Sequence, residues 1–280
     1  MPTAREQRWI SRLRWPTLAA TGVLTCAALV AVPVALASNS ADPGTFENPG
    51  ASERPTPTAL PSETVAPTAS PIRPTLAGLP VTPRALFVGD SFTEGYGTKK
   101  PAANWARIAA ASLGWQATLD GVGGTGYIKD VSTDKRTGRS FVQRIPGLAE
   151  SGVDYDVVVL QGGLNDIAAD STAEYTAVRK TIDSVRAHWP GAVIVVFGPA
   201  EPLGGGTSHL VHLSTIRQAA EASGVVFVDP SSPLAWITAS NTDLLDLGDG
   251  LHLNDSGYAY LAARFVADIQ AASATEQPVD

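Results

Sequence analysis

Cysteine is almost absent from this chain, in which Cys26 is the only one among 280 residues. A single cysteine excludes an intramolecular disulfide, a cysteine-cluster metal site and a CxxC redox motif. Charged residues are also few, at 17% of the sequence, and acidic ones outnumber basic ones, so the formal net charge is −7. Because the chain lacks a basic surplus, we do not expect a nucleic-acid partner.

The few basic residues are unevenly distributed. Residues 1–37 hold four arginines against Glu6 alone, which leaves 20 − 4 = 16 basic and 27 − 1 = 26 acidic residues, a charge of −10, for the rest. The uncharged stretch from Leu18 to Ala37 is either the apolar part of a signal peptide or a membrane anchor. Its length favours an anchor, and the small residues Ala35-Leu36-Ala37 favour cleavage. In either case the arginines stay in the cytoplasm, so we expect the chain after Ser38 to be extracytoplasmic, secreted or anchored.

Composition divides the rest of the chain into three parts. Residues 38–80 are rich in Pro, Thr, Ser and Ala and show no apolar periodicity. Such a stretch cannot bury enough apolar surface to offset its ordering entropy, so we expect a disordered linker. A folded domain is predicted over residues 81–272, followed by a flexible tail over 273–280.

Short apolar runs alternate with helical patterns in the predicted domain. Five runs rich in β-branched residues are predicted as buried strands: 85–88, 116–119, 157–160, 193–197 and 225–228. Helical patterns cover residues 102–113, 173–188, 208–222 and 256–271. Apolar strands separated by helices favour an α/β fold, a three-layer α/β/α sandwich with a parallel, doubly wound, flavodoxin-like sheet of five strands.

Polar motifs follow the first three predicted strands, and a fourth precedes the last predicted helix. They are Gly89-Asp90-Ser91, Gly121-Val122-Gly123-Gly124, Gly162-Gly163-Leu164-Asn165-Asp166 and Asp249-Gly250-Leu251-His252. Taken singly, each has an ordinary explanation as a turn or as a loop whose side chains satisfy local backbone groups. Ligands of open parallel sheets bind beyond the carboxyl ends of the strands, where these motifs are expected to meet. Together they therefore predict a binding or catalytic site.

In their order along the chain, these motifs resemble the four blocks of the SGNH hydrolases, the GDSL esterase/lipase superfamily. The resemblance covers roughly residues 84–271. It implies that Ser91 is the nucleophile, His252 its base and Asp249 the partner of the base. It also implies an oxyanion hole formed by the backbone amides of Ser91 and Gly124 and the side-chain amide of Asn165. A serine hydroxyl needs such a base to become a nucleophile, and the amides would stabilise the negative charge that develops on the ester oxygen.

The function implied is that of an extracytoplasmic serine esterase, which hydrolyses carboxylic esters through an acyl-enzyme and needs no metal or other cofactor. We expect a small to medium acyl group, because no long apolar lid is evident beyond the N-terminus, and acetylated glycans are candidate substrates. Two alternatives stay open: an O-acyltransferase acting on cell-surface sugars, and a non-catalytic surface binding module with the same fold. The sequence indicates no oligomeric state.

Three other patterns have the residue types of binding sites. Residues 121–126 fit the Gly-x-Gly-x-x-Gly pattern, but no helical pattern follows them, so we do not expect a dinucleotide. His209 and His212 are one helical turn apart without a third ligand nearby, which favours surface or packing roles over a metal site. Arg139 and Arg144 belong to a basic cluster in the connection after residue 126. This cluster is either a solvated loop or a border of the pocket that binds anionic or polyhydroxylated substrates.

Overall fold

A single parallel sheet forms the centre of the molecule. The computed structural model describes residues 73–131, 139–200 and 209–276, so the proposed signal or anchor segment and residues 38–72 of the proposed linker lie outside the described residues. The strands are β1 Arg84–Gly89, β2 Gln116–Gly121, β3 Val157–Gln161, β4 Val193–Phe197 and β5 Val226–Val228. They are all parallel and follow the order β2-β1-β3-β4-β5. This is the flavodoxin-like order, and the predicted fold class is confirmed.

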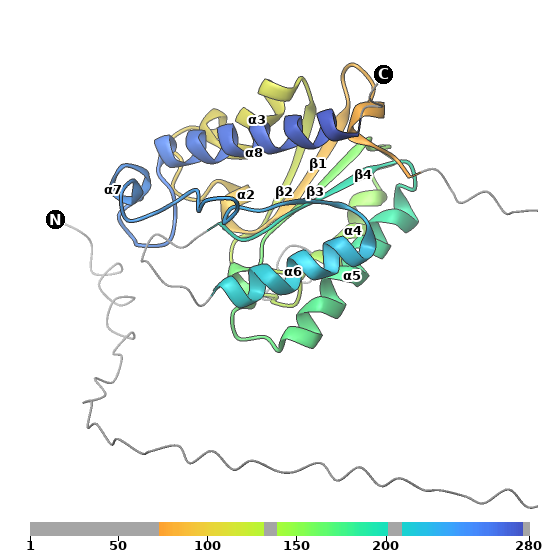
Figure 1. The fold of residues 1–280 in the computed structure, drawn as a ribbon. Helices are drawn as coiled ribbons and strands as arrows, with labels where there is room; N and C mark the ends of the chain where they lie inside the picture. The colour runs from red at the N-terminus through yellow and green to blue at the C-terminus, as the bar shows by residue number, and fades with distance from the viewer. Residues whose placement is uncertain (1–72, 132–138, 201–208, 277–280) are drawn as a thin grey trace, which may run out of the picture. The chain divides into compact units, whose positions relative to one another are not determined.

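Helices cover both faces of the sheet (Figure 1). On one face lie α3 (Trp105–Leu113) and α8 (Asp255–Thr275), and on the other lie α4 (Phe141–Ala149), α5 (Ser171–His188) and α6 (His209–Ser223). Strand β1 shows how the sequence builds the two cores, because alternate side chains point to opposite faces. Ala85 and Phe87 belong to the cluster with α3 and α8, whereas Leu86 and Val88 belong to the cluster with the other helices. Within the described ranges, no helix combines the length and apolar character needed to cross a membrane.

The shorter elements lie mostly in the connections that follow the strands. They are α2 (Ser91–Glu94), α7 (Thr242–Leu245), and the 3-10 helices η1 (Leu76–Gly78), η2 (Pro101–Ala103) and η3 (Leu164–Asp166). Helix α4 was not predicted, because Pro146 and Gly147 interrupt its helical pattern. It nevertheless buries Phe141 and Ile145 against the sheet, and this packing outweighs the poor local propensity.

The packed chain extends beyond both predicted domain boundaries. Leu76, inside the predicted linker, is 5% exposed and joins the core cluster of α3 and α8. At the other end α8 continues to Thr275, and the Glu276 carboxylate accepts a hydrogen bond from the Ala77 amide. The two ends of the domain therefore support each other.

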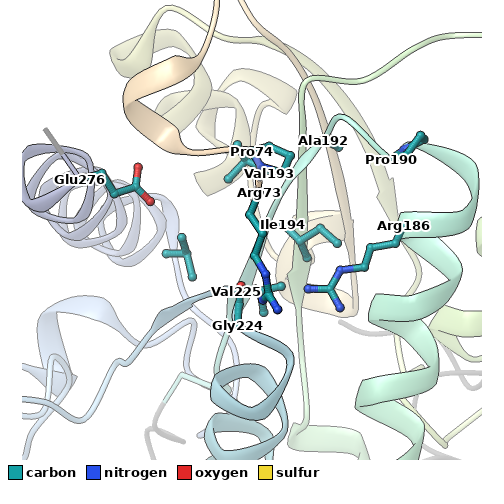
Figure 2. Close-up of a pocket in the computed structure, with 11 residues that line it drawn as sticks. Arg73, Pro74, Arg186, Pro190, Ala192, Val193, Ile194, Gly224, Val225 and Glu276 are labelled. Carbon is teal, nitrogen blue, oxygen red and sulfur yellow. Dashed lines mark hydrogen bonds between the residues drawn. The ribbon is translucent and has the colours of Figure 1, made fainter. Parts of the chain in front are cut away.

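A cavity of about 530 Å³ opens at the amino ends of β4 and β5. Figure 2 shows the side chains of Arg73 and Arg186 approaching each other near Gly224. Both guanidinium groups donate to the Ser223 carbonyl at the end of α6. Since cations stabilise the carboxyl end of a helix, we explain these arginines as caps of α6.

Candidate active site

The residues expected to act together come from four connections and meet at the carboxyl edge of the sheet. Ser91 is the first residue of α2, directly after β1. Gly124 follows β2, and Asn165 lies in η3 after β3. His252 and Asp249 lie in the loop between α7 and α8. The parallel topology therefore brings the four motifs to one edge.

The side chains of Asp249, His252 and Ser91 form a continuous chain of hydrogen bonds. His252 Nε2 lies 3.0 Å from Ser91 Oγ, and His252 Nδ1 lies 2.7 Å from Asp249 Oδ2. An anionic carboxylate can only accept, so it selects the tautomer in which Nδ1 carries the proton. The lone pair of Nε2 is then directed at the Ser91 hydroxyl, as a general base requires.

The loop that carries the histidine is folded around the same carboxylate. Asp249 Oδ1 accepts hydrogen bonds from the backbone amides of Leu251 and His252, at 3.0 and 2.8 Å. Burial acts to raise the pKa of Asp249, but the bonds from the His252 amide and imidazole and from the Leu251 amide outweigh it. The pKa of Asp249 therefore lies below its ordinary value, and this carboxylate stays ionised beside the imidazole.

Helix α8 and two aromatic rings hold the histidine loop in place. Asn254 is the N-cap of α8, and its side chain accepts from the Gly257 amide. The imidazole of His252 contacts the buried ring of Phe92 and the exposed ring of Tyr96, with centroid distances of 5.8 and 4.4 Å. Phe92 replaces the leucine of the GDSL motif and keeps an apolar contact with the base.

The second and third motifs form the other side of the site. The Cβ position of Gly123 lies 3.6 Å from Ser91 Cβ, and Gly124 has a φ of 76°, which favours glycine. Asn165 Nδ2 donates to the carbonyl of Thr125 at 2.9 Å, so one amide hydrogen ties the two motifs together and the other is left. In the described parts of the chain, the backbone amides of Ser91 and Gly124 have no acceptor. They are therefore available to an oxyanion.

Asp166 is a functional residue to which the sequence analysis gave no role. Its carboxylate accepts hydrogen bonds from three consecutive backbone amides, those of Tyr127, Ile128 and Lys129, at 2.7, 3.1 and 2.8 Å. A Cβ atom at Gly126 would clash with Asp166 Oδ2, so only glycine permits this approach. The third motif thus fixes the loop of the second. Its position next to Asn165 was the only signal in the sequence.

The two arginines expected at the pocket have different environments. Arg144 is 5% exposed, donates to the carbonyls of Gly89 and Asp120, and forms an ion pair with the Asp120 carboxylate at 3.2 Å. Burial lowers the pKa of Arg144, although the Asp120 charge opposes this. We therefore correct the assignment of Arg144 from substrate binding to support of the strand ends. Arg139 is partly exposed just before α4, in the connection that follows β2.

The two histidines of α6 are buried, at 2% exposure for His209 and 5% for His212. His212 Nδ1 lies 2.8 Å from Glu174 Oε2, and His212 Nε2 lies 3.1 Å from the carbonyl oxygen of Ile167. These contacts support the packing role for His212. Among the described residues, no group of three or more His, Cys, Asp or Glu side chains could hold a metal ion.

Comparison with known proteins identifies the family of this chain. A model of the GDSL-like lipase/acylhydrolase family matches residues 87–260. The chain belongs to this family. As a GDSL-family protein it is an esterase/acylhydrolase. A GDSL lipase of Mycobacterium tuberculosis is 31% identical over 200 residues, which cover 68% of this chain and 82% of that protein.

Solved structures support the assignment of the fold. An aryl esterase of M. smegmatis superposes with a TM-score of 0.56 at 17% identity, covering 68% of this chain and 99% of the esterase. A carbohydrate acetylesterase family member from Sinorhizobium meliloti gives a TM-score of 0.55 at 17% identity, covering 69% of this chain and 99% of that one. At 17% identity, the similarity of this GDSL-family protein to these two structures shows that all three share a fold.

Proposed function

We propose that this protein hydrolyses carboxylic esters through an acyl-enzyme formed on Ser91. The observation that carries the proposal is the chain of hydrogen bonds from Asp249 through His252 to the Ser91 hydroxyl. Two pairs of atoms within hydrogen-bond distance, linking three side chains, are what general-base activation of a serine requires. A binding module would have no need of this arrangement.

In the first half-reaction, Ser91 Oγ attacks the ester carbonyl carbon while its proton moves to His252 Nε2. The carbonyl oxygen becomes an oxyanion, which the amides of Ser91 and Gly124 and the Asn165 side chain stabilise. Each such donor is worth about 3 kcal/mol in the transition state. The tetrahedral intermediate then breaks its bond to the alcohol oxygen, which takes the proton from His252 and leaves as the free alcohol.

In the second half-reaction, a water molecule attacks the acyl-enzyme. His252 takes a proton from this water, and the same amides stabilise the second oxyanion. The bond between the acyl carbon and Ser91 Oγ then breaks, and the serine oxygen takes the proton back from His252. A carboxylic acid is released and the enzyme is restored, so no metal, nucleotide or redox partner enters the balance.

The proposed substrates are esters with a small to medium acyl group. Two structural neighbours are named as an aryl esterase and a carbohydrate acetylesterase, so aryl esters and acetylated carbohydrates are the two kinds of substrate to assay. Arg139 remains a proposed substrate contact at the pocket border, and Arg139→Ala should raise KM.

The extracytoplasmic location rests on the arginines and apolar stretch of residues 1–37. A reporter that is active only outside the cytoplasm, fused after residue 80, tests the location, and an inactive fusion would reject it.

The direct test is labelling with a fluorophosphonate probe together with hydrolysis of p-nitrophenyl acetate. The wild-type protein should be labelled and active, whereas Ser91→Ala should lose labelling and lower kcat by at least about 10⁴-fold. Ser112→Ala removes an exposed hydroxyl that is bonded to the Ile108 carbonyl, and it should change neither readout. Labelling or turnover that survives in Ser91→Ala would reject the proposal. Added acceptor glycans should not divert the acyl group from water, which distinguishes a hydrolase from an acyltransferase.

A further inference from the structure

Exposed apolar side chains are concentrated at the catalytic edge of this domain. Among the described residues, eleven large apolar side chains are exposed, and eight of them lie in segments between the carboxyl end of a strand and the helix that returns along the sheet. Two more, Leu210 and Val211, lie in the first turn of the returning helix α6. The exception, Val81, precedes β1. Apolar surface gathered on one side of a soluble domain marks a contact site.

Two of these residues contact the catalytic base, Tyr96 through its ring and Leu247 through its backbone amide. Tyr96 is 53% exposed and its ring centroid lies 4.4 Å from that of His252. Leu247 is 37% exposed, and its amide donates to the His252 carbonyl at 2.9 Å. The Leu247 side chain also packs on the backbone next to Tyr96, because a Cβ at Gly97 would meet Leu247 Cδ2 at 2.5 Å. Tyr96 and Leu247 therefore form one apolar wall.

The wall is held firmly in the fold. The Tyr96 amide donates to the Ser91 carbonyl at 2.9 Å, and the Tyr96 carbonyl accepts from the hydroxyl of the buried Tyr258 at 2.9 Å. The neighbouring Lys99 amide donates to Asp255 at the start of α8. Because the backbone beside the nucleophile fixes Tyr96, its exposed ring is a built surface of the site.

The chemistry decides which part of an ester this wall meets. The departing alcohol takes its proton from His252 Nε2, so its oxygen must lie within hydrogen-bond distance of that nitrogen. The carbon atoms attached to that oxygen are then next to the imidazole and to the side chains around it. From this placement, and on the basis of the proposed esterase function, we propose that the wall of Tyr96 and Leu247 binds the leaving group, and that the preferred esters are those of apolar alkyl or aryl alcohols.

A leaving group that is itself a sugar, as in an acetylated glycan, fits this wall less well. An aromatic ring can stack on a sugar face, but the leucine beside it offers no hydrogen bond to the hydroxyl groups around that face. Burying those hydroxyls without partners costs free energy, whereas burying methylene groups releases it. The wall therefore favours alkyl and aryl acetates over acetylated sugars of the same acyl group.

The test is a series of acetates from methyl to hexyl, in which the acyl group is constant and the acidity of the alcohol changes little. Full burial of one methylene is worth about fourfold in kcat/KM, so we expect about twofold per methylene on this half-open wall. Tyr96→Ala with Leu247→Ala should flatten the series, and any loss of rate from the missing ring contact with His252 should be the same for every acetate. Val81→Ala, far from the site, should leave the slope unchanged.

A second series of methyl esters, from acetate to hexanoate, varies only the acyl group. Its slope should be the same in the wild-type protein and in the double variant. A flat alcohol series in the wild-type protein, a slope that survives in the double variant, or higher kcat/KM on an acetylated xylo-oligosaccharide than on hexyl acetate would overturn the leaving-group proposal alone. If no ester were turned over faster than by Ser91→Ala, the proposed function itself would fail.

Discussion

Asp90 is fully buried beside the nucleophile, and only one of its carboxylate oxygens has a hydrogen bond. Oδ1 accepts from the Phe92 amide at the start of α2, whereas Oδ2 has no partner among the described residues. Burial raises the pKa of Asp90 to about 6, although the Phe92 amide, nearby Gln161 and His252 favour the ionised form. The site therefore places a carboxyl group that is costly to ionise directly before Ser91.

This residue should make the stability of the protein depend on pH. The pKa of Asp90 is about 6 in the folded state and near 3.8 in the unfolded state, so the folded state binds the proton of this carboxyl group more tightly. The protonated carboxyl group of Asp90 contributes its full stabilisation to the folded state below pH 4. This contribution is lost as the pH rises to 6, and the loss in the free energy of unfolding is about 3 kcal/mol. Asp90→Asn can still cap α2 but does not titrate. We expect the free energy of unfolding of the wild-type protein, relative to Asp90→Asn, to fall by about this amount between pH 4 and pH 7.

Denaturant titrations of both proteins at several pH values give this difference directly. A difference in the free energy of unfolding that is constant with pH reflects how the asparagine side chain of Asp90→Asn fits its surroundings. Such a constant difference does not affect the comparison between pH values. A difference that is the same at pH 4 and pH 7 would show that folding does not raise the pKa of Asp90.

At the scale of elements, two helices hold the segment that carries Asn165. Glu174 on α5 is fully buried and pairs with His212 on α6, whose Nε2 faces the Ile167 carbonyl just after η3. Both ring nitrogens face oxygen atoms, so the pair must share two protons: an imidazolium with a carboxylate, or an Nε2–H imidazole with a protonated Glu174. Burial raises the pKa of Glu174 to about 7 despite the opposing charge of His212, so both forms fit the site.

The contact should therefore position the third oxyanion donor. His212→Phe keeps most of the volume but releases the Ile167 carbonyl, and we expect kcat to fall about tenfold with KM changed less than twofold. Glu174→Gln can donate to Nδ1 and leave the Nε2–H for Ile167, so it should keep kcat within about threefold. His188→Phe, at the exposed end of α5, is the matched control. The assay runs well below the melting temperature of each variant, and an unchanged kcat in His212→Phe would reject the positioning role.

At the scale of the whole molecule, the sequence predicted the sheet and the site for one physical reason. Strands β1, β3 and β4 are apolar and buried on both faces. The four motifs follow the topology that such strands impose, so Ser91, Gly124, Asn165 and His252 could be assigned to one edge. Long-range contacts gave no local signal. The sequence around Arg144 indicated a basic surface loop, although Arg144 is buried and donates to the Gly89 carbonyl. The sequence around Leu76 gives no indication that this residue packs in the core.

The N-terminal limit of the domain depends on such contacts. Residues 73–80 were predicted as linker, but Leu76 is buried and Arg73 donates to the carbonyls of Ser223 and Gly224. Figure 2 shows the Arg73 side chain next to Gly224. Burial of a leucine side chain is worth about 2 kcal/mol or more. The folded unit therefore includes residues 73–80.

A pair of truncations tests this limit. The variant that begins at Arg73 should hydrolyse a soluble ester with the kcat and KM of the full chain, because every described contact of the site lies after that residue. The variant that begins at Val81 loses Leu76 and the Arg73 contacts. Its melting temperature should fall by about 5 °C or more, since 1 kcal/mol corresponds to about 2–4 °C in a domain of this size. Arg73→Ala in the longer variant separates the cap of α6 from the buried leucine. Equal melting temperatures for the two truncations would show that residues 73–80 contribute nothing to the fold.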